Sequence, residues 1–480
     1  MRLFIPVVFL LVPVSASAQT AALTVHFDRK LQTWDGFGVN YVEVPQTRDY
    51  RRDPQEYGGL SVLSEANRER MLDTLFGPDG LKPGIAKMFL DVWHQAAPGG
   101  PFDHETTTKW MRYFIKEGLR RTRAAGGDMQ VVTTLYGPPA WATKQKFVRG
   151  RDLDPAQARN LATYLISWIR FLRERENIPV RYVSLHNEGE DFERWPINGD
   201  SPGYATHDYN LFWPPRQVTD FMTLLRPMMD AAGLRDVGIT PGETTNWWRF
   251  LTWGYAPAIW GDEAALKSMG LITSHGFTGG DGRWYGGHTG EGVALLRQKR
   301  PELHAWTTSM TWGKMDPNFV TDIRGQIYDV KVNGVIPWAA VQTSKWVGGD
   351  PNPGAAIRVI EDCGCYQVLP GYYYYKQVSR AGQPGMAVAA VEDGAGGLRL
   401  IGFAKNQTRH PDAFVLINTS ADERRASIRV TGSTAARFAA VRTSLNESHK
   451  DAGSFALSGA GFEYTAPGRS VTTFYAQAAQ

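Results

Sequence analysis

Cysteine is almost absent from this chain of 480 residues. Cys363 and Cys365 are the two that occur, and with one glycine between them they cannot join distant segments. They either form a small disulfide or remain as thiols, and no further metal ligands are evident nearby. Stability must therefore come from the core of the fold rather than from cross-links.

Clusters of one charge are missing as well. The formal net charge of +4 is spread along the chain without a run of Lys and Arg, so nucleic acid is not an expected partner. The apolar run behind Arg2 is too short to span a bilayer, and no membrane span is expected. This run leads into Ala-Ser-Ala, which is typical of a secretory signal over residues 1–18 and predicts a secreted or periplasmic protein.

Aromatic residues, by contrast, are plentiful, with 16 Trp, 19 Tyr and 22 Phe. They either fill a large core or provide flat faces for sugar rings, because the C–H faces of sugars pack well on rings that also have a polar edge. For any single Trp, a place in the core is the simpler interpretation.

Eight short apolar segments alternate with helical stretches between residues 35 and 371. Such alternation indicates parallel βα units, and eight units indicate a closed (β/α)8 TIM barrel, an α/β fold. The predicted strands lie in WDGFGVNY, IAKMFLDVW, MQVVTTLYG, VRYVSLHNE, VGITPGE, GLITSHGF, LHAWTTS and VNGVIPWAAV.

The pattern changes near residue 372. Segments such as LRLIGFAKN, AFVLINTS and SVTTFYAQ are short strands separated by turn residues, with almost no helical period. They predict an attached C-terminal antiparallel β-sandwich over residues 372–480. Residues 19–34 form one more strand, which we expect to pair into the sandwich before the chain enters the barrel over residues 35–371. That pairing would lock the two domains together.

Chemically active side chains recur at the ends of the predicted barrel strands, where catalytic residues of such barrels stand. An isolated acidic residue in a loop is usually a solvated surface charge. A set of carboxylates, His, Asn and Trp at successive strand ends instead indicates an active site. The candidates are Asp91, Trp141, Asn187, Glu188, Glu243, His275 and Trp338.

The chain resembles glycoside hydrolase family 30, the glucosylceramidase and xylanase-like enzymes, in the order of five motifs. These are WDGFGVNY, YGPPAWAT, LHNEGE, ITSHGF and VLPGYYYYKQVSRAG, and the Asn-Glu pair is the most specific of them. The resemblance covers nearly the whole mature chain. It implies a carbohydrate substrate, namely a poly- or oligosaccharide whose O-glycosidic bonds the enzyme cleaves. Nothing in the sequence requires a metal or an organic cofactor, and a monomer is expected.

The resemblance also implies roles for single residues. Glu188 would be the general acid/base, since a carboxyl at a partly desolvated barrel mouth can hold the proton that the glycosidic oxygen needs. Asn187 would hydrogen-bond the sugar 2-hydroxyl. His275 would contact the nucleophile or the substrate, unless it is a structural histidine. The remaining substrate-binding candidates are Asp91, Trp141, Ser309 and Trp338.

One position departs from the family pattern. The nucleophile of the family is a Glu at the end of the seventh strand, in the form aromatic-x-x-Glu. Laid on Trp306-Thr307-Thr308, that Glu falls on Ser309, and no residue from Ala305 to Lys314 is acidic. A serine hydroxyl is too short and too weakly acidic to replace a carboxylate at C1. The retaining double-displacement mechanism therefore cannot be transferred intact.

Three explanations of Ser309 stay open. In the first, a displaced carboxylate acts, Glu243 being the leading candidate and Asp91 the second, and the enzyme inverts if a water fits between that group and Glu188. In the second, the substrate supplies its own nucleophile, such as an acetamido group. In the third, the barrel has lost catalysis and binds glycans. The retained Asn187–Glu188 pair argues against the third, because a lectin needs no placed acid.

Overall fold

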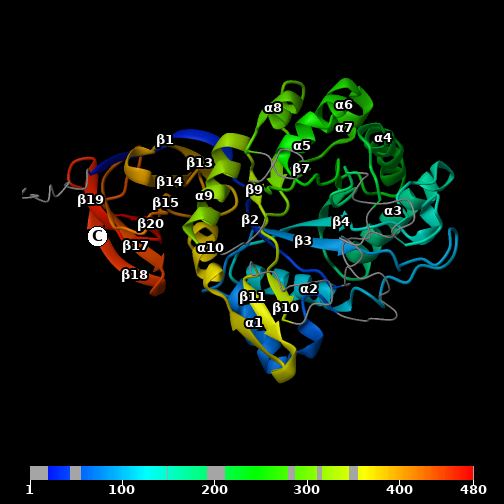
Figure 1. Cartoon of the computed structure of the whole chain (residues 1–480), viewed down its shortest axis with the longest axis horizontal. Coiled ribbons are helices and arrows are strands. Elements are labelled where there is room, and N and C mark those ends of the chain that lie inside the picture. Colours follow the sequence, from blue (N-terminus) through cyan, green and yellow to red (C-terminus); the bar gives the residue numbers. More distant parts are fainter. Residues whose placement is uncertain are drawn as a thin grey trace, which may run out of the picture.

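Two sheets organise the chain in the computed structural model, a parallel barrel and a mostly antiparallel sheet beside it (Figure 1). The predicted signal segment, residues 1–18, lies outside the residues that the structure describes. Those residues are 20–43, 56–148, 150–191, 211–278, 287–310, 316–344 and 355–478.

The parallel sheet has eight strands in the order β6-β5-β4-β3-β2-β9-β8-β7. Hydrogen bonds from Gly270 N to Ile239 O (2.8 Å) and from His275 N to Thr244 O (2.8 Å) bridge β6 and β7, so the barrel is nearly closed. The predicted barrel is confirmed. Its strands are β2 (Gly36–Asn40), β3 (Ile85–Leu90), β4 (Gln130–Leu135), β5 (Val180–Ser184), β6 (Gly238–Thr240), β7 (Ile272–Ser274), β8 (Ala305–Thr307) and β9 (Gly334–Val335).

Amphipathic helices cover the outside of the barrel. In α3, Leu161, Leu165 and Trp168 share one fully buried face, and Trp168 Nε1 donates to Thr133 Oγ1 in β4 (2.9 Å). No helix within the described ranges is both long and apolar enough to cross a membrane. The helices of this part are α1 (Glu65–Phe76), α2 (Lys109–Ala124), α3 (Ala158–Glu174), α4 (Pro215–Ala231), α5 (Trp247–Thr252), α6 (Tyr255–Gly261), α7 (Glu263–Ser268), α8 (Glu291–Arg297) and α9 (Pro317–Gly325).

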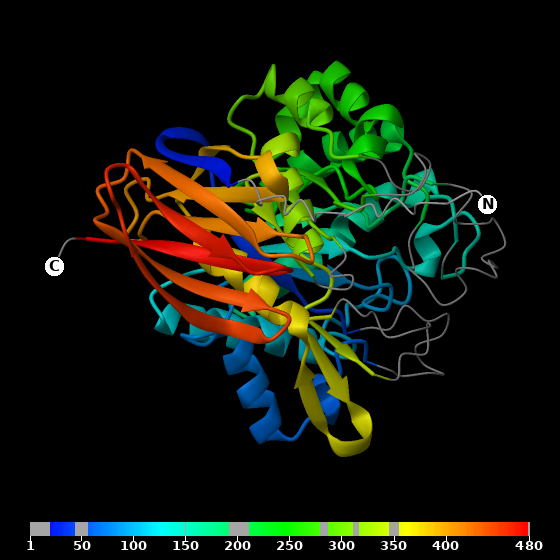
Figure 2. The same ribbon diagram turned by 60° about the vertical axis from the view of Figure 1, so that its left-hand side comes forward.

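The second sheet has nine strands and folds over on itself (Figure 2). Its order is β18-β17-β20-β15-β14-β13-β1-β16-β19. The two edge strands meet across the core, since the rings of Phe455 in β18 and Phe462 in β19 are 5.4 Å apart. This arrangement is the predicted sandwich. Its strands are β1 (Ala21–Thr33), β13 (Ala387–Glu392), β14 (Leu398–Ala404), β15 (Ala413–Asn418), β16 (Arg424–Thr431), β17 (Arg437–Ser444), β18 (Glu447–Ala456), β19 (Gly461–Ala466) and β20 (Ser470–Gln477).

Strand β1 and helix α10 are two of the elements that join the barrel to the sandwich. Strand β1 pairs antiparallel with β13 and parallel with β16 before the chain enters the barrel at β2. Helix α10 (Pro370–Ala381) lies between the two parts (Figure 1). In α10 the Tyr375 hydroxyl donates to Gly38 O of the barrel (2.8 Å), and the Tyr374 hydroxyl donates to Arg469 O beside β20 (3.0 Å).

Helix α10 corrects one detail of the sequence analysis. The boundary expected at residue 372 falls inside this helix, and the strands that follow begin only at Ala387. Nine of its twelve residues are buried, because the barrel and the sandwich cover it from two sides. Its apolar residues still lie mainly on one side, so the sequence carries a helical pattern across the expected boundary.

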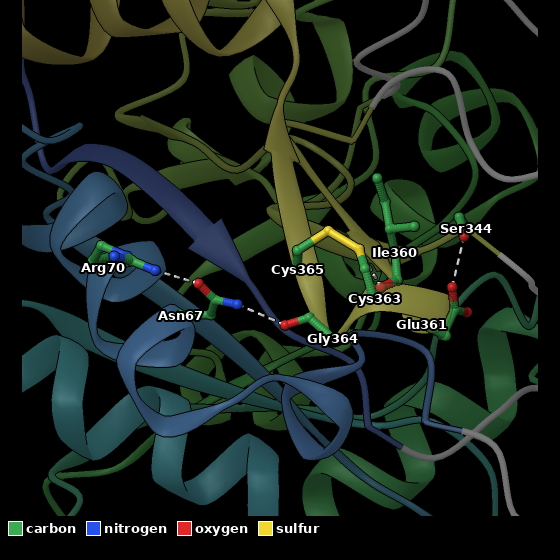
Figure 3. The surroundings of a disulfide bond; sticks show 8 residues. All are labelled: Asn67, Arg70, Ser344, Ile360, Glu361, Cys363, Gly364 and Cys365. Carbon is green, nitrogen blue, oxygen red and sulfur yellow. Dashed lines mark hydrogen bonds between the residues drawn. A yellow bond between two sulfur atoms is a disulfide. The ribbon is translucent and has the colours of Figure 1, made fainter.

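A small three-stranded sheet carries the two cysteines. Of the two states left open by the sequence, the structure has the disulfide between Cys363 and Cys365, in the turn from β11 to β12 (Figure 3). The turn contacts α1, because Asn67 Nδ2 donates to Gly364 O (2.7 Å). The bond therefore closes a single turn and does not join the barrel to the sandwich. The strands are β10 (Val341–Thr343), β11 (Ile357–Ile360) and β12 (Cys365–Val368).

Candidate active site

Backbone hydrogen bonds tie the carboxyl end of β5 to that of β6. Glu188 N donates to Glu243 O (2.7 Å), and Glu243 N donates to His186 O (3.0 Å). Glu188 has a backbone φ of 53°. This left-handed conformation is rare outside glycine and costs roughly 1–3 kcal/mol, which surrounding contacts must offset. The turn after β5 thus holds Glu188 in one defined backbone conformation.

His275 follows β7 and bridges two carboxylates. Its Nδ1 lies 2.9 Å from Glu188 Oε1, and its Nε2 lies 3.2 Å from Glu243 Oε2. Burial lowers the pKa of this imidazole, but hydrogen bonds to the two carboxylates outweigh burial, and the pKa of His275 is raised. When protonated, the ring donates from both nitrogens, which suits two acceptor groups.

Glu243 forms the inner end of this chain of contacts. Lys87 Nζ in β3 donates to Oε2 (2.5 Å), and Thr134 Oγ1 in β4 donates to Oε1 (2.8 Å). Burial raises the pKa of the Glu243 carboxyl, but Lys87 and His275 outweigh it and lower this pKa to about 2. None of the side chain is exposed. Its environment is that of an internal counter-ion, whereas the sequence suggested an accessible nucleophile or base.

Asp91, the second candidate for a displaced carboxylate, follows β3 and holds its own loop. Its Oδ1 accepts from Trp93 N (2.7 Å), and its Oδ2 accepts from the Thr107 hydroxyl (2.6 Å). The Tyr164 hydroxyl donates to Asp91 O (2.5 Å), and the Tyr164 ring meets Trp141 edge-on at 6.2 Å. Asp91 and Trp141 therefore belong to one packed group that follows β3 and β4.

Two charged residues of this region were not singled out from the sequence. Glu43 follows β2 and accepts from Met111 N at the start of α2 (2.7 Å), and burial, together with nearby Asp91, raises its pKa to about 8. The sequence feature that could have revealed Glu43 is its position just after a predicted barrel strand. Lys87 is fully buried. The sequence feature that could have revealed Lys87 is a charged residue inside an apolar strand, because a buried charge requires a partner.

Ser309 and Asn187 lie beside the Glu188 cluster. Ser309 follows β8 and is 2% exposed, and its carbonyl accepts from Gly276 N (2.7 Å), so it neighbours His275. Asn187 forms an isolated parallel bridge with Glu243. Within the described residues, no three His, Cys, Asp or Glu side chains are grouped so as to hold a metal ion.

Two tryptophans stand at other strand ends. Trp141 follows β4, is 9% exposed and donates from Nε1 to Gln95 O (3.0 Å). Trp338 follows β9 and is partly exposed, and its ring packs against Tyr57 at 5.5 Å and Phe89 at 6.1 Å. Trp338 therefore has more surface to offer a ligand than Trp141. It stays a prediction that Trp141 and Trp338 both line a sugar-binding pocket.

The Lys87–Glu243 pair is testable by a double-mutant cycle. Lys87→Met should lower the free energy of unfolding by about 3–5 kcal/mol, because it leaves the Glu243 charge buried without its partner. The double variant Lys87→Met/Glu243→Gln should be more stable than Lys87→Met alone, since a neutral amide needs no counter-ion. Urea unfolding measures both. Purely additive losses would contradict the charge pairing.

Comparisons with known proteins place the fold. No family model and no curated protein sequence matches the chain. A glycoside hydrolase family 30 subfamily 8 xylanase from Clostridium acetobutylicum matches in structure with a TM-score of 0.70 and 17% identity, over 95% of this chain and all (100%) of that one. The catalytic domain of xylanase C from Talaromyces cellulolyticus reaches 0.70 at 16% identity (95% and 100% covered), and an endo-β1,6-glucanase reaches 0.65 at 18% (95% and 94%). At these identities the likeness concerns architecture, and the chain has the fold of family 30 glycosidases.

Proposed function

We propose that the protein is a glycoside hydrolase that cleaves O-glycosidic bonds of a poly- or oligosaccharide, with Glu188 as general acid. One observation carries this proposal, namely the rise in side-chain exposure along the contact chain. Glu243 is 0% exposed, His275 3% and Glu188 9%. A proton held between His275 and Glu188 therefore leaves through Glu188, at the open end of the chain, where a glycosidic oxygen can take it.

The fold and the strand-end residues support the substrate class. The solved structures with this fold include two xylanases and an endo-β1,6-glucanase. For this chain we infer a carbohydrate substrate, with Asn187 beside the acid on the 2-hydroxyl of the sugar. The predicted signal segment would export the enzyme to its substrate.

The buried contacts give each residue a task in proton transfer. Glu188 protonates the leaving oxygen as the glycosidic bond breaks. His275 Nδ1 keeps the Glu188 carboxyl oriented and shares the proton with its Oε1. The ionised Glu243 stabilises the imidazolium, and Lys87 keeps Glu243 ionised. Lys87 and Glu243 are therefore positioning residues that act through His275.

The group that attacks C1 is neither Ser309 nor Glu243 in this proposal. The Ser309 hydroxyl is too weakly acidic, and the Glu243 side chain has no exposed surface. The two remaining candidate nucleophiles are a water molecule and an acetamido group of the substrate. Attack by water inverts the configuration at the anomeric centre, whereas attack by the acetamido group leads to retention. Because serine is smaller than glutamate, Ser309 leaves more volume at this position for a water molecule or for an acetamido group.

Glycan binding without hydrolysis is the second candidate function, and Ser309 is the observation that favours it. The buried cluster favours hydrolysis, however. Taking Lys87, Glu243 and His275 out of water has a large cost, and sugar binding alone does not require charges buried behind a carboxyl. No turnover on a glycan panel, together with measurable binding, would establish the second function.

Glu188→Gln keeps the size of the side chain and removes the proton. We expect turnover of natural glycans, with xylan and β-1,6-glucan tested first, to fall roughly 10²- to 10⁴-fold. Thermal unfolding and glycan binding should stay near wild type. Glu174→Gln, which removes a carboxylate from the exposed side of α3, is the matched control. Turnover by Glu188→Gln at the wild-type rate would refute the assignment.

Glu243→Gln tests the positioning role through pH. Glu243 raises the pKa of His275, so its neutralisation should lower that pKa. The shared proton is lost as pH rises through this pKa, and the alkaline limb of the kcat/KM profile should therefore move to lower pH. The profile of Glu174→Gln should not move. Reduced activity with an unmoved alkaline limb would show that Glu243 supports only the fold.

Ser309→Ala should leave turnover within about tenfold, because a hydroxyl at this position contributes about one hydrogen bond. A loss beyond a thousandfold would instead give Ser309 a catalytic role.

Proton NMR of the first-formed anomer identifies the attacking group. On xylan, which carries no acetamido group, we expect inversion by water. Retention on xylan would require a nucleophile from the protein.

A further inference from the structure

Two adjoining cavities lie between the barrel and the sandwich, away from the candidate active site. Their volumes are about 570 Å³ and 310 Å³, and both are lined by Lys82, Gln383 and His410. Lys82 lies three residues before the first residue of β3, at the amino end of that barrel strand. Glu188, in contrast, follows the carboxyl end of β5. The cavities are thus at the opposite end of the barrel from Glu188.

The smaller cavity is lined by two cationic side chains and two histidines, and burial lowers the pKa of both histidines. Lys82 comes from the barrel, Arg380 from α10, and His410 and His449 from the sandwich, and none of the described residues that line this cavity is acidic. Arg409 adds a further positive charge to the larger cavity. Burial and the neighbouring Arg380 and Arg409 lower the pKa of Lys82, as expected where positive charges gather.

The nearest carboxylates are used elsewhere. Asp128 lines the larger cavity and pairs with Arg123 at 3.0 Å. Asp79 pairs with Lys376 at 3.0 Å and lies 4.0 Å from Arg380, and its side chain is 88% exposed. The Lys82 ammonium has neither a hydrogen bond nor an ion pair with any described residue. Asp79 acts on Lys82 only through space, so the hydrogen-bond donors of the ammonium are left for a ligand.

Two buried polar groups on the sandwich side point to the same conclusion. The Tyr475 hydroxyl and His449 Nε2 border the smaller cavity and are shielded from solvent, and neither makes a well-formed hydrogen bond with a described residue. Arg380 lies near the Tyr475 hydroxyl and acts to lower its pKa. Burial raises the pKa of Tyr475 to about 12, so the hydroxyl keeps its proton. A buried polar group without a hydrogen-bond partner is unfavourable, so a ligand that supplies the partner gains affinity.

We propose that the smaller cavity binds an oxyanion, with Lys82 and Arg380 supplying charge and Tyr475 and His449 supplying hydrogen bonds. A volume of 310 Å³ suits a single small ligand. The shared chemistry is a compact group of anionic oxygens, as in inorganic phosphate or in the carboxylate of a uronic acid. Because the ligand contacts barrel, α10 and sandwich together, its binding stabilises their junction. The site does not involve Glu188 and is independent of the proposed hydrolysis.

Calorimetry and thermal unfolding of the full-length protein test this site. Sodium phosphate and sodium glucuronate are titrated separately against sodium chloride at equal ionic strength, with glucose as the neutral control. We expect at least one of the two anions to bind and to raise Tm by more than chloride does, because a ligand specific to the native state stabilises it. Phosphate binding alone identifies an inorganic ligand, and glucuronate binding alone identifies an acidic sugar.

Variants locate the binding. Lys82→Met should weaken the anion at least tenfold, and Tyr475→Phe should weaken it as well while leaving the charge in place. Lys450→Met, which removes an exposed lysine from β18, is the matched control and should bind as wild type does. The proposal is overturned if neither anion binds, if glucose binds equally well, or if both Lys82→Met and Tyr475→Phe bind as tightly as wild type.

Discussion

Lys87 carries its charge in the middle of an apolar barrel strand, and the candidate site is arranged around it. An ammonium that is fully buried inside the barrel is unfavourable unless an ionised partner lies within reach. Glu243 meets that need at 2.5 Å. The ionised Glu243 in turn favours a protonated His275, and His275 holds Glu188. One buried charge thus aligns groups from β3 and from the ends of β6, β7 and β5.

Charge balance in this cluster offers a physical reason why Ser309 is tolerated. Lys87 and the ionised Glu243 balance each other, and His275 and Glu188 share one proton, so that the second pair is neutral overall as well. Lys87 also donates to Thr308 O (3.3 Å), the residue next to Ser309. A further carboxylate at position 309 would add a negative charge to a cluster that is already balanced and largely shielded from water.

The sandwich is coupled to the base of the barrel rather than to its mouth. Strand β1 pairs within the sandwich and then continues into β2, and α10 hydrogen-bonds to both parts through Tyr374 and Tyr375. A ligand in the cavity beside Lys82 would therefore act on the junction of the two parts. Its effect on the chemistry at Glu188 would have to pass through the barrel strands.

The sequence by itself determined the eight barrel strands, the sandwich and the strand ends that carry the candidate residues, because periodicity and turn residues are local properties. Helix α10 lies across the boundary expected at residue 372, and only the packing of the barrel and the sandwich around it decided its place. The contact between Lys87 and Glu243 joins residues 156 positions apart. Only the closed barrel decided that contact, and with it whether each strand-end carboxylate faces a ligand or a buried lysine. The order of strands predicts which residues reach the same end, but their depth and partners depend on how all eight strands pack around one interior.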